Sequence, residues 1–155
     1  MHILFNHIKK YIKIIIFSIL SVFFVSSSNA ELTVEDIIKS RQALFSKNYS
    51  TAKRVQAFSS KGDFEKAKKL MIEMSENYKV LIELFPENTQ EGFDTGALLT
   101  IWDEKDEFNA LMQKASDDMT KLVSVIEDAD DIRGTLTKFM WSNCKACHSR
   151  YREEH

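Results

Sequence analysis

Five consecutive residues near the end of the chain, Cys144-Lys145-Ala146-Cys147-His148, limit what it can fold into more than any other segment. On a helix, positions 144, 147 and 148 have the spacing i, i+3 and i+4, so their side chains leave one helix face together. Two thiols can add to porphyrin vinyl groups while the adjacent imidazole ligates iron, and C-x-x-C-H is the attachment pattern of c-type haem. The run therefore predicts one covalent haem c, bound through Cys144 and Cys147, with His148 as the iron ligand.

Other functions of these cysteines explain less of the pattern. A redox-active C-x-x-C pair normally follows a strand in a βαβ unit, whereas this pair lies in a helical pattern within the last dozen residues. A structural zinc site needs four ligands. Beyond the three residues of the motif, residues 31–155 offer only the terminal His155, so there is no second pair of ligands at a usable spacing. A disulfide between Cys144 and Cys147 would close a very short loop and constrain little.

Residues 1–30 are predicted to be a secretory signal peptide. The segment has a basic start (Lys9, Lys10, Lys13), an apolar run of 12 residues (Ile14–Val25) and small residues up to Ala30. An uncleaved membrane anchor is disfavoured because a spanning helix needs about 20 apolar residues. Cleavage after Ala30 would place residues 31–155 in the periplasm as one domain of ordinary size. Export agrees with the haem prediction, since bacterial c-type haem is attached outside the cytoplasmic membrane.

The predicted mature chain is acidic. Removing residues 1–30 takes away three lysines and no acidic residue, which changes the formal net charge from −2 to −5. Nucleic acid is therefore excluded as a partner, because phosphate binding needs a basic surface.

Four segments carry apolar residues at helical spacing. They cover residues 33–58, 63–85, 103–126 and 132–151. We expect Thr33 and Asp63 to cap the first two helices, Gly62 to form the turn between them, and Pro86 to end the second helix. Residues 86–101 are expected to form a long connection. The fold is predicted to be all-α, with the short links 59–62 and 128–131 making each pair of helices antiparallel neighbours. Methionine and aromatic residues on the apolar stripes are expected in the core.

Several segments besides the haem motif together resemble the cytochrome c′ family, the class II c-type cytochromes. They are Arg41-Gln42-Ala43-Leu44-Phe45, Leu84-Phe85-Pro86-Glu87, Ile101-Trp102-Asp103 with Phe108, and Cys144 to Arg152. The first resembles the R-Q segment of the family's first helix, and the second the L-F-P stretch that ends its second helix. The third and fourth resemble its I-W-x-x…F segment and its C-K-x-C-H-x-x-Y-R ending. The resemblance spans essentially all of residues 31–155 and implies an up-down-up-down, antiparallel four-helix bundle.

The resemblance also implies roles for individual residues. Cys144 and Cys147 match the thioether attachments and His148 the proximal ligand. Arg41 matches an arginine near a haem propionate, and Arg152 matches one beside the proximal imidazole. The alternative for both arginines is a solvated helix face, where they would contribute little. Phe45 matches the position that faces the distal side of the iron.

The sequence predicts an iron with one protein ligand. Low-spin relatives place a methionine on the first helix as sixth ligand, but no methionine lies between Glu31 and Leu70. His155 follows His148 on the same helix and cannot reach the opposite haem face. A distal site walled by Phe45 and other apolar groups should favour NO and CO over O₂, because distal polarity decides which ligand is held.

Two functions stay open at this point. The first is binding of NO and CO in the periplasm together with one-electron transfer. The second is a dedicated electron carrier that passes electrons between redox partners. The sequence does not identify these partners. A haem enzyme such as a peroxidase is disfavoured, because no distal acid–base pair is evident. Family members often dimerise through their first two helices, so the resemblance also allows a homodimer.

Overall fold

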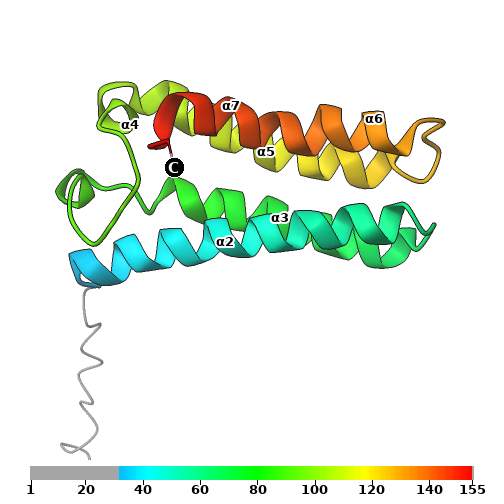
Figure 1. Cartoon of the computed structure of the whole chain (residues 1–155), viewed down its shortest axis with the longest axis horizontal. Helices are drawn as coiled ribbons and strands as arrows, with labels where there is room; N and C mark the ends of the chain where they lie inside the picture. Colours follow the sequence, from blue (N-terminus) through cyan, green and yellow to red (C-terminus); the bar gives the residue numbers. More distant parts are fainter. Residues whose placement is uncertain (1–31, 155) are drawn as a thin grey trace, which may run out of the picture. The chain divides into compact units, whose positions relative to one another are not determined.

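The computed structural model describes residues 32–154 of the chain, and the predicted signal peptide lies outside the described residues. The long helices are α2 (Val34–Ser59), α3 (Phe64–Ile82) and α5 (Lys105–Val125) (Figure 1). The last rod consists of α6 (Ile132–Leu136), a π-helical turn, η2 (Thr137–Trp141), and α7 (Ser142–Tyr151). Between residues 32 and 154 there is no strand, and the one isolated bridge joins Ala97 to Arg152. The all-α prediction is confirmed.

The ends of the first two helices lie where their capping residues predict. Thr33 and Asp36 form a capping box, in which the Asp36 amide donates to Thr33 Oγ1 (3.1 Å) and the Thr33 amide to Asp36 Oδ2 (3.2 Å). The chain leaves α2 through Gly62, whose φ of +75° suits a residue without a Cβ. Asp63 then caps α3 by accepting from the Lys66 amide.

α3 ends a few residues earlier than the predicted segment, which ran to Phe85 next to Pro86. The helix ends at Ile82, and the next turn is tightened by bonds from Glu83 N to Val80 O (3.2 Å) and from Leu84 N to Leu81 O (3.1 Å). A residue before proline avoids the helical region, so the helix must unwind before Phe85. Pro86 is already extended, with φ −68° and ψ 159°.

The connection between α3 and α5 contains two short helices, η1 (Glu87–Thr89) and α4 (Thr100–Asp103). The third predicted helix therefore begins as α4, breaks at Glu104, where φ is −120° and ψ is 44°, and continues as α5.

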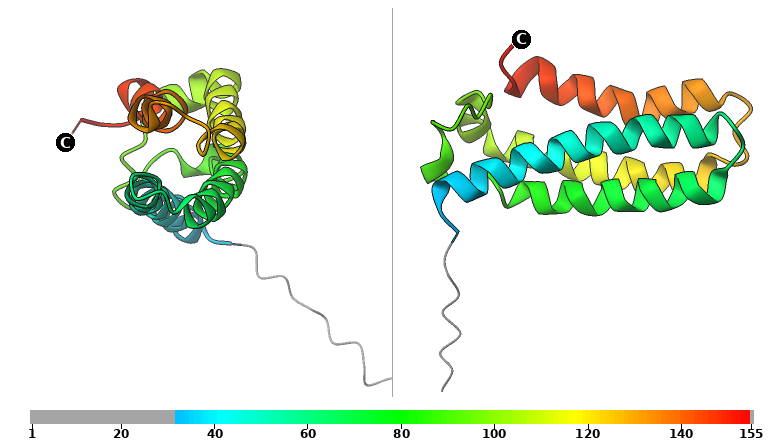
Figure 2. Two further views of the ribbon diagram at one scale, coloured as in Figure 1. Left: turned by 90° about the vertical axis from the view of Figure 1, so that its right-hand side faces the viewer. Right: turned by 60° about the horizontal axis from the view of Figure 1, so that its bottom comes forward.

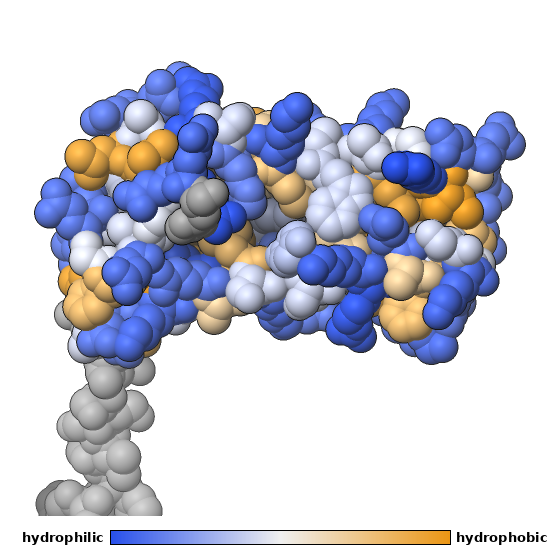
Figure 3. Space-filling model, in the orientation of Figure 1, coloured by the Kyte–Doolittle hydropathy of each residue, from blue (hydrophilic) through white to orange (hydrophobic). Residues whose placement is uncertain are grey.

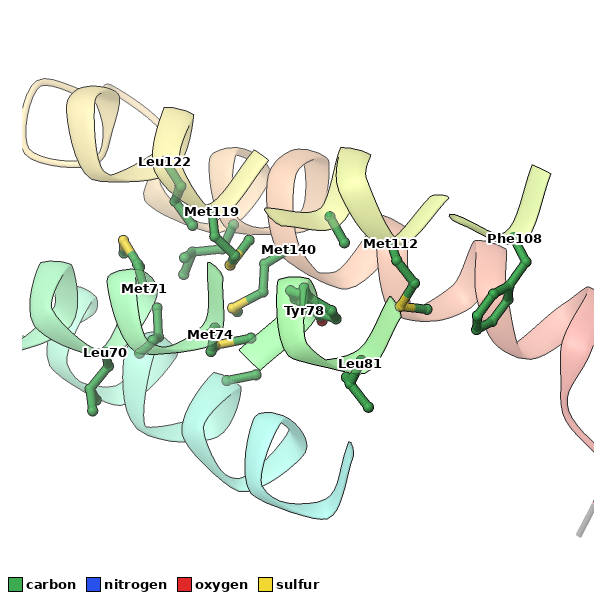
Figure 4. Packing of buried hydrophobic residues seen from close by; sticks show 14 of the residues in the cluster. Leu70, Met71, Met74, Tyr78, Leu81, Phe108, Met112, Met119, Leu122 and Met140 are labelled. Carbon is green, nitrogen blue, oxygen red and sulfur yellow. The ribbon is translucent and has the colours of Figure 1, made fainter. Parts of the chain in front are cut away.

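The helices pack as two antiparallel pairs, α2 with α3 and α5 with the α6–α7 rod (Figure 2). The pairs meet mainly where α3 packs against α5. The interface is rich in methionine, and all five methionines of residues 32–154 are buried, as the stripes predict (Figure 4). They are Met71, Met74, Met112, Met119 and Met140. The face drawn in Figure 3 is mostly hydrophilic, with small separate apolar patches.

One gap in this packing matters for function. The α6 segment packs against α2, but α7 is not among the main partners of α2. There is therefore space between α2 and α7 that the contacts between these two helices do not fill. Within residues 32–154, no helix has the length and the hydropathy that crossing a membrane requires.

Replacing Gly62 tests the turn that sets the antiparallel pairing of α2 and α3. Gly62→Ala should lower the free energy of unfolding by about 1–2 kcal/mol, because an L-residue is strained at positive φ. Ser60→Ala is the matched control, since Ser60 is exposed and has φ −65°. Urea unfolding of both variants and the parent protein measures the difference. Equal stability of the two variants would contradict the assigned turn.

Candidate functional site

A cavity of about 860 Å³ lies between α2, α3, α5 and α7, within the size range of cofactor sites. All six residues that the sequence singles out border it, and they come from both ends of the chain. They are Arg41 and Phe45 from α2 and Cys144, Cys147, His148 and Arg152 from the last rod and its end. The structure therefore brings together residues that lie about a hundred positions apart in the sequence.

The π-helical turn directly before the motif sets the direction in which its side chains point. A π turn contains an extra residue, so it changes the face that the following helix presents, and such turns recur at functional sites. Trp141, the last residue of this turn, donates from Nε1 to Gln56 Oε1 of α2 (3.0 Å) and fixes the start of α7. From there, Cys144, Cys147 and His148 follow along the cavity border.

No disulfide joins Cys144 and Cys147. Burial raises the pKa of the Cys144 thiol. Burial, with a smaller contribution from neighbouring Cys144, raises the pKa of Cys147 to about 11. The thiols are therefore protonated at neutral pH and are held at the border of a largely apolar cavity, where they are not available as ready metal ligands.

His148 borders the cavity in a form suited to iron. Partial burial, followed by the nearby positive charge of Arg152, lowers the pKa of the His148 imidazole. The ring is therefore neutral at pH 7, and neutral imidazole is the form that ligates a metal. Arg152 lies just beyond α7 in extended backbone, where its bridge to Ala97 and the bond from Glu153 N to Gly96 O (3.1 Å) hold it.

Arg41 is buried and lies at the border of the cavity without an acidic partner among residues 32–154. Its guanidinium donates to Leu84 O (3.2 Å), to Thr89 O and Oγ1 (both 2.8 Å) and to Thr95 Oγ1. It also lies over the ring of Phe85, 4.5 Å from the centroid. Burial lowers the pKa of Arg41 to about 10, which leaves it cationic at neutral pH. The alternative of a solvated helix face is wrong for this arginine.

Phe45 borders the cavity from α2, whereas the residues of the motif border it from α7. Its ring makes an edge contact with Phe85, with centroids 6.3 Å apart, and Phe85 in turn contacts Phe108 at 4.7 Å. Among the described residues, the only thioether at the cavity border is Met112, which comes from α5.

The cavity also has polar and aromatic residues that the sequence interpretation did not assign to it. They include Gln42, Asn48, Tyr49, Tyr78, Trp141 and Asn143. Asn48 and Tyr49 lie three and four positions after Phe45, so helical spacing from Phe45 could have identified them. Tyr78 was expected only as a core residue. The wall is thus less uniformly apolar than we expected.

The residues at the cavity fit a haem c. The cavity border has two thiols and a neutral imidazole from one helix, and a buried cation, Arg41, that has no acidic partner among residues 32–154. A buried charge without a counter-charge is costly, so the site of Arg41 suits a carboxylate such as a haem propionate. The cavity size and its aromatic border suit a large flat ring.

Replacing Arg41 tests how far this cation holds the cavity wall together. Arg41→Lys keeps the charge but loses the planar fork of donors, and we expect the free energy of unfolding to fall by roughly 2 kcal/mol. Arg54→Lys, at an exposed position on the same helix, is the control and should leave stability nearly unchanged. Denaturant unfolding of the purified protein provides the comparison. An Arg41→Lys protein as stable as the control would contradict the assigned network.

Comparison with known proteins agrees with this site. The family model described as Cytochrome C′ matches residues 36–152. Cytochrome c′ of Rhodopseudomonas palustris is 28% identical over 131 residues, which is 83% of this chain and 89% of the relative.

Solved structures extend the likeness to the fold. A structure of cytochrome c′ from R. palustris has a TM-score of 0.66 at 28% identity and covers 77% of this chain and 97% of its own. A nitric oxide complex of a variant of cytochrome c prime from Alcaligenes xylosoxidans has a TM-score of 0.67 at 22% identity, covering 80% and 99%. At that identity the second likeness concerns the fold alone. Because the family model matches most of the described residues, the chain belongs to the cytochrome c′ family of haem c-binding four-helix bundles.

Proposed function

We propose that this protein is a periplasmic haem c protein whose iron has one protein ligand and binds NO and CO at an open distal position. One-electron transfer is a second capability of the same site. The observation that carries the proposal is the composition of the cavity border. α7 offers Cys144, Cys147 and His148, while the residues of α2 at the border include Phe45 and Tyr49 but no histidine, methionine or cysteine.

The motif residues would hold the cofactor at one face. Cys144 and Cys147 would form the thioethers, and His148 would ligate iron as the proximal imidazole. The bound haem supplies an iron that takes a diatomic ligand and changes between the ferrous and ferric states. Arg41 would pair with a propionate, which would give its buried charge the anion that it lacks among the described side chains. Membership of the cytochrome c′ family supports haem c as the group.

Arg152 would adjust the proximal ligand. Its positive charge near His148 opposes the development of imidazolate character, so it would weaken electron donation from the ring to iron. A weaker iron–histidine bond favours NO, the diatomic ligand best able to break it. The lowered pKa of His148 supports such an electrostatic influence.

Phe45 would keep the sixth position free of protein ligands. A phenyl ring fills space and excludes water without donating electrons to iron. The thioether of Met112 comes from α5, which packs against α3 and α7, and not from α2. The nitric oxide complex is that of a variant of the A. xylosoxidans protein, and it supports the choice of NO as the ligand proposed here.

A dedicated electron carrier is the alternative function, and it would use the same residues. The two functions differ at the sixth position, because a carrier benefits from a fixed ligand set whereas a gas-binding protein needs an open site. The composition of the α2 wall favours the open site. Redox partners and the homodimer that the resemblance allows stay predictions. We do not propose an enzymatic reaction for this site.

Export through a cleaved signal peptide is part of the proposal, and proteins of this family are periplasmic. The boundary after Ala30, with residues 31–155 as the mature domain, stays a prediction. It agrees with a helical fold whose capping box begins at Thr33, a few residues beyond the proposed cleavage point.

The attachment is tested on protein purified from its native host. The intact mass should equal residues 31–155 plus one haem, and acidified acetone should leave the colour on the protein because thioether bonds survive it. The Cys144→Ala/Cys147→Ala double variant should release all of its haem. Complete extraction of colour from the parent protein would contradict covalent attachment, and a mass that begins at Met1 would favour the anchor.

The open sixth position is tested by changing Phe45. Phe45→Met places a thioether on α2 and should convert the ferrous haem toward a six-coordinate low-spin spectrum. Phe45→Ala should increase the rate of CO binding, because it removes the group that narrows the entry. Phe58→Met is the matched control, since Phe58 lies on the same helix and does not border the cavity. Identical ferrous spectra of the Phe45→Met and Phe58→Met proteins would contradict the assigned place of Phe45.

A further inference from the structure

The basic residues of this acidic protein are concentrated in two helical segments. Residues 37–62, which are most of α2 and the turn after it, contain six lysines and arginines and no acidic residue. Residues 132–152, the α6–α7 rod and the residue after it, contain five and again no acidic residue. The other helices lie within residues 63–131, which contain 18 acidic residues and seven lysines. The predicted net charge of −5 is therefore the sum of two strongly basic segments and an acidic remainder.

The two basic segments lie on the same side of the bundle. In the end-on view of Figure 2, α2 and the α6–α7 rod form one side, and α3 and α5 form the other. Tyr49 of α2 and Lys145 of α7 both border the cavity and are exposed, so the cavity opens to the surface between these helices. The positive charge is thus placed around the opening of the candidate haem site.

An aromatic pair flanked by two lysines lies at this opening. The rings of Tyr49 and Trp141 make an edge contact, with centroids 6.4 Å apart. Lys53 Nζ lies 4.2 Å from the centroid of the Tyr49 ring, and Lys145 follows one turn after Trp141. Neither lysine forms an ion pair with an acidic side chain of residues 32–154. These four residues, here called the basic rim, therefore offer two uncompensated charges and an exposed ring to a partner.

We propose that the basic rim docks an acidic surface of a protein that exchanges one electron with the bound haem. This inference rests on the proposed function, since it needs a haem in the cavity. Electron transfer slows steeply with distance, so a partner is best placed where the cavity opens. Positive charge at that place attracts an acidic partner and orients it there, even though the two proteins would repel each other on net charge alone.

A protein partner suits the basic rim better than an anionic lipid surface. A helix that lies on a membrane buries a broad apolar face among the lipid chains. Of the exposed large apolar side chains among residues 32–154, Tyr49 alone belongs to the two basic segments. Tyrosine and tryptophan surrounded by polar groups are instead typical of the contact area between proteins.

The salt dependence of electron transfer to hexacyanoferrate(III) tests the charge at the opening. One electron passes from the ferrous haem to the probe, which becomes hexacyanoferrate(II), and no proton moves. The probe has three negative charges, so attraction by the basic rim makes the rate constant fall as salt screens it. Repulsion by the net charge of −5 would instead make the rate constant rise with salt, and that result would overturn the inference.

Two double variants with the same net charge locate the effect. Lys53→Glu/Lys145→Glu reverses both charges of the basic rim and should slow the reaction at low salt by about tenfold. Lys69→Glu/Lys121→Glu makes the same change at exposed lysines of α3 and α5, and should change the rate by less than about twofold. Equal slowing of the two variants would overturn the inference.

Binding of poly-L-glutamate tests the acidic polypeptide partner without measuring electron transfer. Titration calorimetry of the haem-containing protein at low salt should detect binding that Lys53→Glu/Lys145→Glu loses and Lys69→Glu/Lys121→Glu keeps. Binding of phosphatidylglycerol vesicles or of a single-stranded oligonucleotide in preference to poly-L-glutamate would overturn the choice of partner. A haem that cannot be cycled between the ferrous and ferric states would overturn the proposed function. A haem that cycles in a protein that binds no poly-L-glutamate would overturn the inference alone.

Discussion

The structure depends on a cavity that its own side chains do not fill. Bundle helices normally bury their apolar stripes against one another, but here α7 faces a cavity of about 860 Å³ instead of α2. The rest of the core is formed by the methionine-rich packing between α3 and α5, which does not involve contacts between α2 and α7. The bundle can therefore be well packed and still keep one site that needs a large flat group for completion. We expect a bound haem to stabilise the fold, since its ring packs against the cavity wall only in the folded state.

Arg41 and Gln42 connect the first helix to the end of the last one. Arg41 holds Leu84, Thr89 and Thr95 by hydrogen bonds, while Gln42 Nε2 donates to Phe93 O (3.2 Å) and Asp94 O (2.7 Å). These bonds fix a connection in which Phe93 and Asp94 have positive φ, which is unusual for residues other than glycine. The same connection then continues to main-chain contacts with the end of α7, through the bonds from Leu98 N to Tyr151 O and from Glu153 N to Gly96 O (both 3.1 Å). In this way α2 determines where Arg152 lies beside His148.

Much of this arrangement follows from local sequence rules. The spacing of Cys144, Cys147 and His148 is enough to place them on one face, and capping rules locate the ends near Thr33 and Asp63. The π turn before the motif could not be predicted in the same way. Its last residue, Trp141, bonds to Gln56 of α2, and the local sequence does not indicate a contact between segments so far apart in the chain. The role of Phe45 could be assigned only from the sequence and the structure together. The family resemblance indicated that it faces the distal side of the iron, and the structure showed which aromatic residues it contacts.

The proposed gas-binding function requires His148 to be the only protein ligand of the iron. Resonance Raman spectroscopy of the ferrous protein without added gas tests it most directly, because the iron–histidine stretching band is seen when the sixth position is empty. We predict that band together with five-coordinate high-spin marker bands. Six-coordinate low-spin marker bands without an iron–histidine band would show that a second side chain ligates the iron, and they would contradict the account given for Phe45.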